Sequence, residues 1–306
     1  MNTEKKYVSE PEVDLKEVVL ILWSRKILII AITTLSIIIS LLYALSLPNI
    51  YTSKSLLTSV AIDSSLNSKA SDYSALASFA GININPGNAS KSDEAIERIK
   101  SFDFFSNHFL NQIKLENLMA AKDWDHVSNK IIYDQKLFDE SNSKWVRKVS
   151  YPFQPRPTYQ EAFIEYMKIL TINKDKKSSF VSIEIKHVSP HIAKKWSYII
   201  INSINNLMRE IDKSEAKNSI DFLNNTAQAT QLSGLTDVIS KLLEDQIRTL
   251  VLAESSSDYV FKIISSPIAP EHKSEPSRLL ILIYGSIAGL IIAASLSILQ
   301  YYINRE

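Results

Sequence analysis

The sequence predicts an α+β membrane protein, in which two transmembrane helices flank a water-soluble α/β base domain with a long extended helix. Two uncharged apolar runs, one near each end of the chain, predict the membrane helices. Between them, alternating apolar and polar residues predict strands. A long run with apolar residues at steps of three and four predicts the extended helix.

The two apolar runs are long enough to cross a bilayer. Residues 27–47 would measure about 31 Å as a helix, close to the hydrocarbon thickness, and residues 279–303 about 37 Å. A buried core helix is the alternative, but apolarity on all sides over this length would need a far larger protein to cover it. A cleavable signal peptide is a second alternative for the first run, yet this run exceeds a signal core and follows about 26 residues of polar chain.

Basic residues beside the runs predict the orientation. Arg25 and Lys26 directly precede the first run and Arg305 follows the second, so both termini are expected in the cytoplasm and the domain outside it. The predicted segments are a cytoplasmic N-terminal segment (1–26), a first transmembrane helix (27–47), a periplasmic domain (48–278), a second transmembrane helix (279–303) and a cytoplasmic C-terminus (304–306).

Strand patterns occur in four parts of the domain. Val181, Ile183 and Ile185 alternate with polar residues, which predicts one buried and one wet face. The charged run 174–178 before them is expected to be a hairpin turn. The predicted strands are 51–60, 169–173, 180–187 and 259–264.

Two irregular segments are predicted from composition. Residues 81–91 combine Gly, Pro and Asn and should form a loop, followed by a helix capped by Ser92, with Asp93 and Glu94 at its positive end. Three prolines in residues 151–157 predict an extended connector.

From Pro190 the pattern becomes helical. Residues 190–228 would form a helix of about 58 Å, and a second apolar stripe follows the break at Gly234, giving a long helical region over about 190–254. Two long helices on a compact base suggest subunits packed side by side. A helical hairpin within one chain is the alternative, and the sequence leaves both open.

No catalytic, cofactor or metal site is predicted. The chain has no cysteine, which excludes disulfides, Cys-ligated zinc and a Cys nucleophile, and it has no P-loop or G-x-S-x-G motif. His187 and His191 are separated by Pro190 at a strand-to-helix junction, so a shared metal is not expected. The net charge of +1 gives no reason to expect nucleic acid.

Several short sequence blocks near the two apolar runs stand out by their residue types. Before the first, Asp14 and Leu15 precede an apolar stretch, Trp23 and the basic pair Arg25 and Lys26. Further matching blocks are 51–53, 94–105, 252–254, 258–264 and 270–278. Pro267, Pro270 and Pro276 lead into the second run, which contains Gly285-x-x-x-Gly289.

These blocks resemble the Wzz family of polysaccharide co-polymerases, the O-antigen chain-length determinants, in its class 1 form without a kinase domain. The order of span, domain, proline segment and span is the most specific feature. Ser265 and Ser266 depart from the family, in which an acidic residue and a further proline are common before Pro267.

The resemblance implies an inner-membrane protein that forms a ring-shaped homo-oligomer and has no catalytic activity or cofactor. It would act with a Wzy-type O-antigen polymerase to set the modal length of lipopolysaccharide O-antigen. The growing lipid-linked glycan and the lipid bilayer are further expected partners.

Two groups of residues are the candidate sites. Pro267, Pro270 and Pro276 would hold an extended chain at the membrane, and this segment could also face the polymerase. Gly285 and Gly289 form a small-x-x-x-small motif that permits close helix packing, and they are candidates for a polymerase contact.

Three other functions are weighed. The protein could regulate another surface glycan, namely enterobacterial common antigen or an exopolysaccharide. It could be a membrane-tethered periplasmic sensor, although no cytoplasmic output domain is recognised. A glycan-processing enzyme is disfavoured by the missing catalytic motifs.

Overall fold

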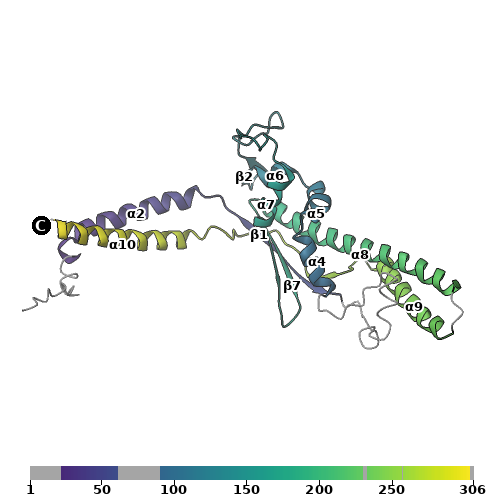
Figure 1. The fold of residues 1–306 in the computed structure, drawn as a ribbon. Coiled ribbons are helices and arrows are strands. Elements are labelled where there is room, and N and C mark those ends of the chain that lie inside the picture. Colours follow the sequence, from purple (N-terminus) through teal and green to yellow (C-terminus); the bar gives the residue numbers. More distant parts are fainter. Residues whose placement is uncertain (1–21, 61–89, 230–232, 257, 304–306) are drawn as a thin grey trace, which may run out of the picture. The chain divides into compact units, whose positions relative to one another are not determined.

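The computed structural model describes residues 22–60, 90–229, 233–256 and 258–303 (Figure 1). It confirms the predicted fold class, with mixed helix and sheet, two helices fit to span a membrane and one long helix. The chain divides into two compact units, which are described separately: Met1–Asn49 with Ser274–Glu306, and Ile50–Lys273.

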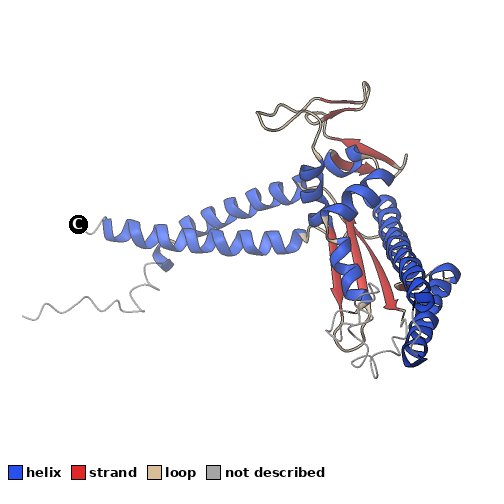
Figure 2. Ribbon diagram, turned by 45° about the vertical axis from the view of Figure 1, so that its right-hand side comes forward, coloured by secondary structure: helices blue, strands red, loops and turns tan. Residues whose placement is uncertain are grey.

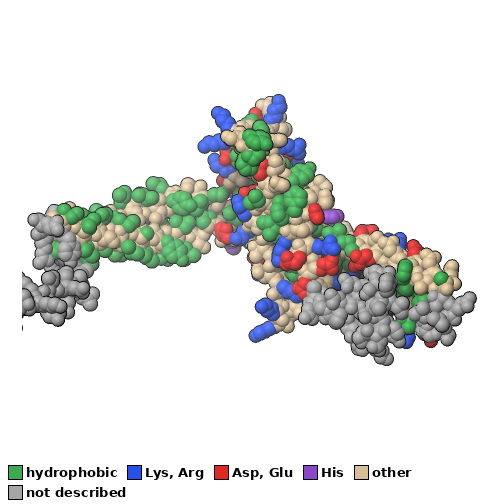
Figure 3. All heavy atoms as spheres, in the orientation of Figure 1, with side chains coloured by type: hydrophobic (Ala, Val, Ile, Leu, Met, Phe, Trp, Pro, Cys, Tyr) green, Lys and Arg blue, Asp and Glu red, His purple; other side chains and the backbone are tan. Residues whose placement is uncertain are grey.

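The first unit contains the two predicted spans. Helix α2 covers Lys26–Ser46 and α10 covers Arg278–Ile303. Only 6% and 11% of their most apolar windows are buried, so neither is a core helix of a soluble domain. Apolar side chains, interspersed with other side chains and backbone, are spread along the visible surface of the helix pair (Figure 3). This pattern fits lipid as the surrounding solvent and makes the chain a membrane protein.

The second unit is built on a four-stranded antiparallel sheet in the order β6-β7-β1-β8. The strands are β1 (Tyr51–Ser59), β6 (Leu170–Lys174), β7 (Val181–His187) and β8 (Phe261–Ser265), which confirms all four predicted strands with small shifts at their ends. Figure 2 shows these strands beside the long helix. Val181, Ile183 and Ile185 are fully buried, as their alternation predicted.

Short helices cover this sheet. They are α4 (Lys91–Ile99), α5 (Phe102–Phe104), the π-helical turn η3 (Phe105–Phe109), the 3-10 turn η4 (Leu110–Gln112), α6 (Leu115–Met119) and α7 (Tyr159–Ile169). Aromatic rings fill the space beneath them. The Phe105 and Phe109 rings each lie 5.0 Å from the Tyr166 ring, and Phe109 meets Trp196 edge-on at 5.7 Å.

The cap of α4 differs from the prediction. The helix begins one residue after Ser90, whose hydroxyl accepts from the Asp93 amide while the Asp93 carboxylate accepts from the Ser90 amide. Ser92, which was expected to cap, lies inside the helix. A capping box needs an acidic residue three positions after the cap, and Ser90 has Asp93 there, whereas Ser92 has Ala95. Of the predicted loop 81–91, residues 81–89 lie outside the described residues, and Lys91 is already the first residue of α4.

A pair of small hairpins, which the sequence analysis did not predict, extends from the base. They are formed by β2 (Ala121–Asp125) with β3 (Lys130–Tyr133), and by β4 (Phe138–Asp139) with β5 (Lys144–Trp145). The strands are short and most of their side chains reach solvent. Their burial patterns therefore lack the clear alternation that marked β7.

The long helical region is a hairpin within the chain. Helix α8 covers Pro190–Ala229, and its 40 residues would extend about 60 Å. Helix α9 (Ser233–Ser255) folds back along it, and Leu223 is buried against Ile239 and Leu242. Figures 1 and 2 both show α9 beside the far half of α8. Packing between subunits remains a proposal.

Candidate functional site: the paired spans and the proline segment

The two membrane helices meet along a seam of small side chains. On α10 the buried or half-buried positions Gly285, Gly289, Ala293 and Ser297 follow one another at steps of four. A Cβ atom on Gly285 would lie 1.8 Å from Ser40 Oγ, and one on Gly289 would lie 2.5 Å from Ser36 Cβ. Glycine is therefore required at both positions for this approach of the helices.

Polar contacts tie the seam together along its length. In the middle, Ser36 Oγ donates to the Gly285 carbonyl at 2.8 Å. At one end the Arg25 guanidinium donates to the Gln300 side chain, and at the other Arg278 Nη2 donates to Asn49 Oδ1 at 3.2 Å. These contacts fix an antiparallel pair in one register.

The predicted glycine motif thus packs against the protein's own first span. The side of α10 that faces away from this seam carries exposed Tyr284, Ile287 and Ile291. Any other membrane protein that contacts α10 has to approach from that side. The polymerase contact itself remains a proposal.

The proline segment follows β8 and stays attached to the base. Pro267 is buried and Pro270 is half-buried, and between them the Ile268 carbonyl accepts a 2.8 Å hydrogen bond from the buried Ser53 hydroxyl of β1. Proline has no amide hydrogen and cannot continue a strand ladder. The segment therefore leaves the sheet while a side chain still holds it beside β1. Pro276 lies in the membrane unit, half-buried, two residues before α10.

The N-terminal motif is only partly within the described residues. Asp14 and Leu15 lie outside them. Trp23 is 72% exposed, and Lys26 Nζ lies 5.7 Å from the centroid of its ring. An exposed Trp beside cations at the end of a span is typical of the membrane–water interface.

Two buried polar anchors, which the sequence analysis missed, join β8 to the long helix. The Asn205 side chain accepts from the amides of Val260 (3.1 Å) and Phe261 (2.9 Å) and donates to the Phe261 carbonyl (2.8 Å). About two turns further along α8, the buried Asp212 carboxylate accepts from the Tyr259 hydroxyl and pairs with Lys91. Burial, together with this carboxylate, raises the pKa of Tyr259.

His187 has a structural role. Its Nδ1 accepts from the Ser189 amide at 2.9 Å, so the other nitrogen, Nε2, donates to the Asn117 carbonyl at 3.0 Å. Burial lowers the pKa of His187 to about 4, and the ring is neutral at pH 7. Among the residues that the structure describes, no group of three or more His, Cys, Asp or Glu could hold a metal ion.

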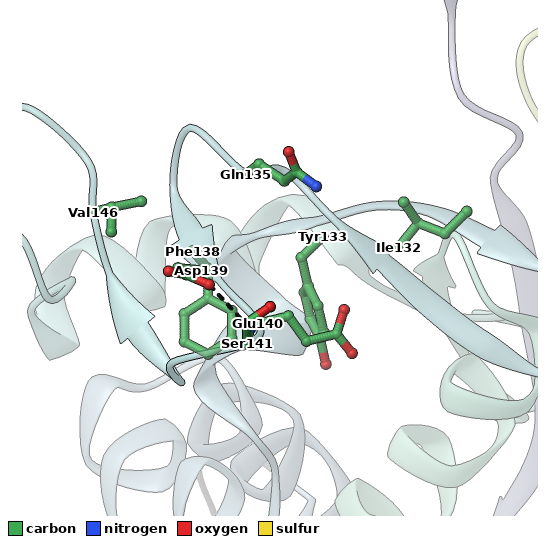
Figure 4. A pocket seen from close by; sticks show the side chains of 8 residues that line it. All are labelled: Ile132, Tyr133, Gln135, Phe138, Asp139, Glu140, Ser141 and Val146. Carbon is green, nitrogen blue, oxygen red and sulfur yellow. Dashed lines mark hydrogen bonds between the residues drawn. The ribbon is translucent and has the colours of Figure 1, made fainter.

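One open pocket of about 550 Å³ lies in the hairpin extension (Figure 4). It is lined by Ile132, Tyr133, Gln135, Phe138, Asp139, Glu140, Ser141 and Val146. The Asp139 carboxylate is already used locally, since it accepts from the Ser141 amide at 3.0 Å and from the Asn142 side chain at 2.7 Å. The lining contains no His, Cys or Lys, and it offers no nucleophile paired with a base.

Together, the fold and the candidate site define a membrane protein with two paired spans and, between them in the sequence, an α/β domain. Residues 11–109 match the family model described as "Wzz: Chain length determinant protein". The matched part includes the first span and the first strand, and it agrees with the resemblance to the chain length determinant family that the sequence predicted.

Two solved structures are similar. A "full-length bacterial polysaccharide co-polymerase" shares 13% identity, with 95% of this chain and 99% of that chain covered and a TM-score of 0.44. A "Fragment of WzzB, Polysaccharide Co-polymerase from Salmonella Typhimurium" shares 12% identity, with 74% and 100% covered and a TM-score of 0.30. No curated protein sequence matches the chain.

Proposed function

We propose that this protein sets the modal chain length of a surface polysaccharide, the lipopolysaccharide O-antigen made by a Wzy-dependent pathway. The observation that carries the proposal is the match of residues 11–109 to the chain length determinant family. In this proposal the protein is a non-catalytic scaffold, and the polymerase performs the chemistry.

Membrane anchoring on both sides of the domain suits a scaffold. The seam at Gly285 and Gly289 pairs the two spans, so both ends of the domain are held at one place in the membrane. Arg25 and Lys26 beside the first span support cytoplasmic termini and a periplasmic domain. The base and its 40-residue helix then face the compartment in which the lipid-linked glycan grows.

Assembly into a ring of identical subunits is part of the proposal. The helical hairpin leaves apolar side chains in water, with Phe222, Ile247 and Val251 exposed on α8 and α9. A second copy packed against these helices would remove this surface from solvent, which favours association. The number of subunits would set the geometry that the polymerase meets.

The polymerase contact is proposed on the outward side of α10, at Tyr284, Ile287 and Ile291. Replacing Ile287 and Ile291 with Trp should change the modal glycan length while the seam stays intact. The matched control is the pair Ile38→Trp with Leu42→Trp on the exposed side of α2, where no polymerase contact is proposed.

Deletion of the gene, followed by electrophoresis of lipopolysaccharide, tests the proposed function. Loss of the preferred length, with polymer still present, supports it. Complete loss of polymer would show that the protein is needed for polymerisation itself, and an unchanged ladder would contradict any role in O-antigen length. Gly285→Leu combined with Gly289→Leu should broaden or shorten the distribution in a complemented strain, because the spans can no longer pair.

A further inference from the structure

The loop that follows β5 in the hairpin extension displays apolar side chains in water. Tyr151 is 97% exposed and Phe153 is 53% exposed, and Val146 and Val149 are exposed beside them. We call residues 144–156, which are β5 and the loop that follows it, the basic-aromatic loop. Exposed aromatic residues grouped in this way mark an interaction surface.

The charge of the basic-aromatic loop has one sign. It contains four cations, Lys144, Arg147, Lys148 and Arg156, and the sequence has no acidic residue between Glu140 and Glu161. Lys144, Lys148 and Arg156 are exposed. Cations interleaved with aromatic side chains fit an anionic membrane surface, where the rings enter the headgroup level and the cations meet phosphates.

The fourth cation holds the loop in shape. Arg147 forms two parallel bonds with Glu161, at 2.6 and 2.8 Å, and it also donates to the carbonyls of Gln154 and Pro155. The Phe153 amide donates to the Ser150 carbonyl at 3.0 Å and closes a turn at the tip. These hydrogen bonds hold the loop in one conformation with its aromatic residues exposed, which lowers the entropic cost of docking.

The extension contacts the strand that follows the first span in the sequence. The Trp124 ring of β2 meets the Tyr51 ring at 5.7 Å. Tyr51 comes five residues after Ser46, the last residue of α2. Even a fully extended chain of five residues spans at most about 18 Å. The chain that joins α2 to this contact is therefore short.

From this charge and exposure, and from the short chain that joins α2 to Tyr51, we propose that the basic-aromatic loop docks on the surface of the bilayer by binding anionic phospholipid headgroups. It would give the domain a third membrane contact besides the two spans. This inference does not rest on the proposed function in glycan synthesis.

Single-cysteine labelling tests the proposal on the full chain, because the protein has no cysteine of its own. A fluorescent probe is attached at Ser150→Cys, in the loop, and in a second protein at Ser240→Cys. Ser240 is exposed on α9, beside the part of α8 that lies about 50 Å along the helix from Pro190. Each protein is placed in nanodiscs that contain nitroxide-labelled lipid, which quenches a probe at the membrane surface.

The expected result is at least threefold stronger quenching at residue 150 than at residue 240 in discs with phosphatidylglycerol. It should fall to the residue-240 level in phosphatidylcholine discs and after Lys148→Glu with Arg156→Glu. The matched control, Lys217→Glu with Lys241→Glu, makes the same charge change on the long helices and should leave quenching unchanged. Tyr151→Ser with Phe153→Ser is a second, charge-neutral variant that should also abolish quenching.

Two results would overturn the proposal. One is equal quenching at residues 150 and 240, or quenching at 150 that survives both loop variants. The other is a blue shift of the probe at residue 150 without quenching by lipid, which would show that a protein surface, either a second copy or another partner, covers the loop.

Discussion

The two units of this protein pack by opposite means. The soluble unit buries its largest side chains, and the Trp196 ring, only 2% exposed, lies 4.8 Å from the His187 ring and 5.7 Å from Phe109. The membrane unit buries its smallest, since its seam is formed by Gly, Ala and Ser. One chain thus shows two solutions to the packing of helices.

The solvent explains the difference. In water, burying a large apolar side chain removes much surface from solvent and stabilises the fold. In lipid, Ile and Leu lose little by staying exposed, so helices pair through close backbone approach and hydrogen bonds. Position rather than hydrophobicity should therefore decide the effect of a substitution in the membrane unit. Five predictions test the two units, three in the soluble unit and two in the membrane unit.

The largest effect is expected in the soluble core. Trp196→Ala should lower the free energy of unfolding by about 3–5 kcal/mol, because it leaves a cavity among Phe109 and His187. Trp23→Ala is the matched control, since its ring is 72% exposed and should leave the unfolding free energy of the soluble unit unchanged. Denaturation of the protein in nanodiscs measures both, and equal losses would contradict the comparison.

Acid should weaken the soluble unit by up to about 3 kcal/mol through His187. The pKa of His187 is lowered from 6.5 to about 4 on folding, so the unfolded chain binds the proton more readily between these values. The contribution to stability is present above pH 6.5 and is lost as the pH falls toward 4. Melting temperatures from pH 7 to pH 4 measure this loss. His187→Gln should flatten the profile, whereas His191→Gln should leave it as in the wild type.

A second acid-sensitive contact acts at lower pH. Arg147 lowers the pKa of Glu161 from 4.5 to about 2, so its stabilisation is present above pH 4.5 and is lost as the pH falls toward 2. Glu161→Gln should remove this part of the pH dependence. A Glu161→Gln profile that still falls below pH 4.5 as steeply as the wild type would assign the loss to other groups.

Overpacking the seam should cost about 1–3 kcal/mol of span pairing. Gly289→Leu places its side chain where Ser36 lies, whereas Ile287→Leu is on the exposed side and should have no effect. A short bismaleimide between Arg25→Cys and Gln300→Cys, whose side chains meet at one end of the seam, reports the pairing. Slower crosslinking with Gly289→Leu alone is expected, and equal rates in both variants would show that the seam does not hold the helices.

The smallest effect is expected for the hydrogen bond across the seam. Ser36→Ala removes the bond to the Gly285 carbonyl, and such bonds in membranes contribute about 0.6 kcal/mol. The same crosslinking assay should show at most a threefold change in rate. A loss as large as that of Gly289→Leu would mean that hydrogen bonding, rather than close approach, dominates the seam.

Strongly periodic elements could be predicted from sequence alone. The spans, β7 and the 40-residue α8 each follow from a pattern that the solvent imposes on the chain. The hairpins β2–β3 and β4–β5 have no buried face, so their sequences carry no such pattern and they could not be predicted. The helix cap at Ser90 could have been predicted from the sequence, because Asp93 follows it at the capping-box spacing.

Only part of the candidate site could be predicted from the sequence. The spacing of Gly285 and Gly289 predicts a close helix approach, but not that α2 of the same chain supplies the partner at Ser36 and Ser40. Asn205 and Asp212 looked like ordinary polar residues of an amphipathic helix. Their roles depend on the amides of β8 and the Tyr259 hydroxyl, which only the folded chain brings to them.

The electrophoretic ladder of lipopolysaccharide tests the central claim most directly. A deletion strain is complemented with the wild-type gene, and the glycan length distribution is compared with that of the uncomplemented strain. The deletion strain should still make polymer without a preferred length, and the wild-type gene should restore the mode. Ladders with the same mode in both strains would contradict a role in O-antigen chain length.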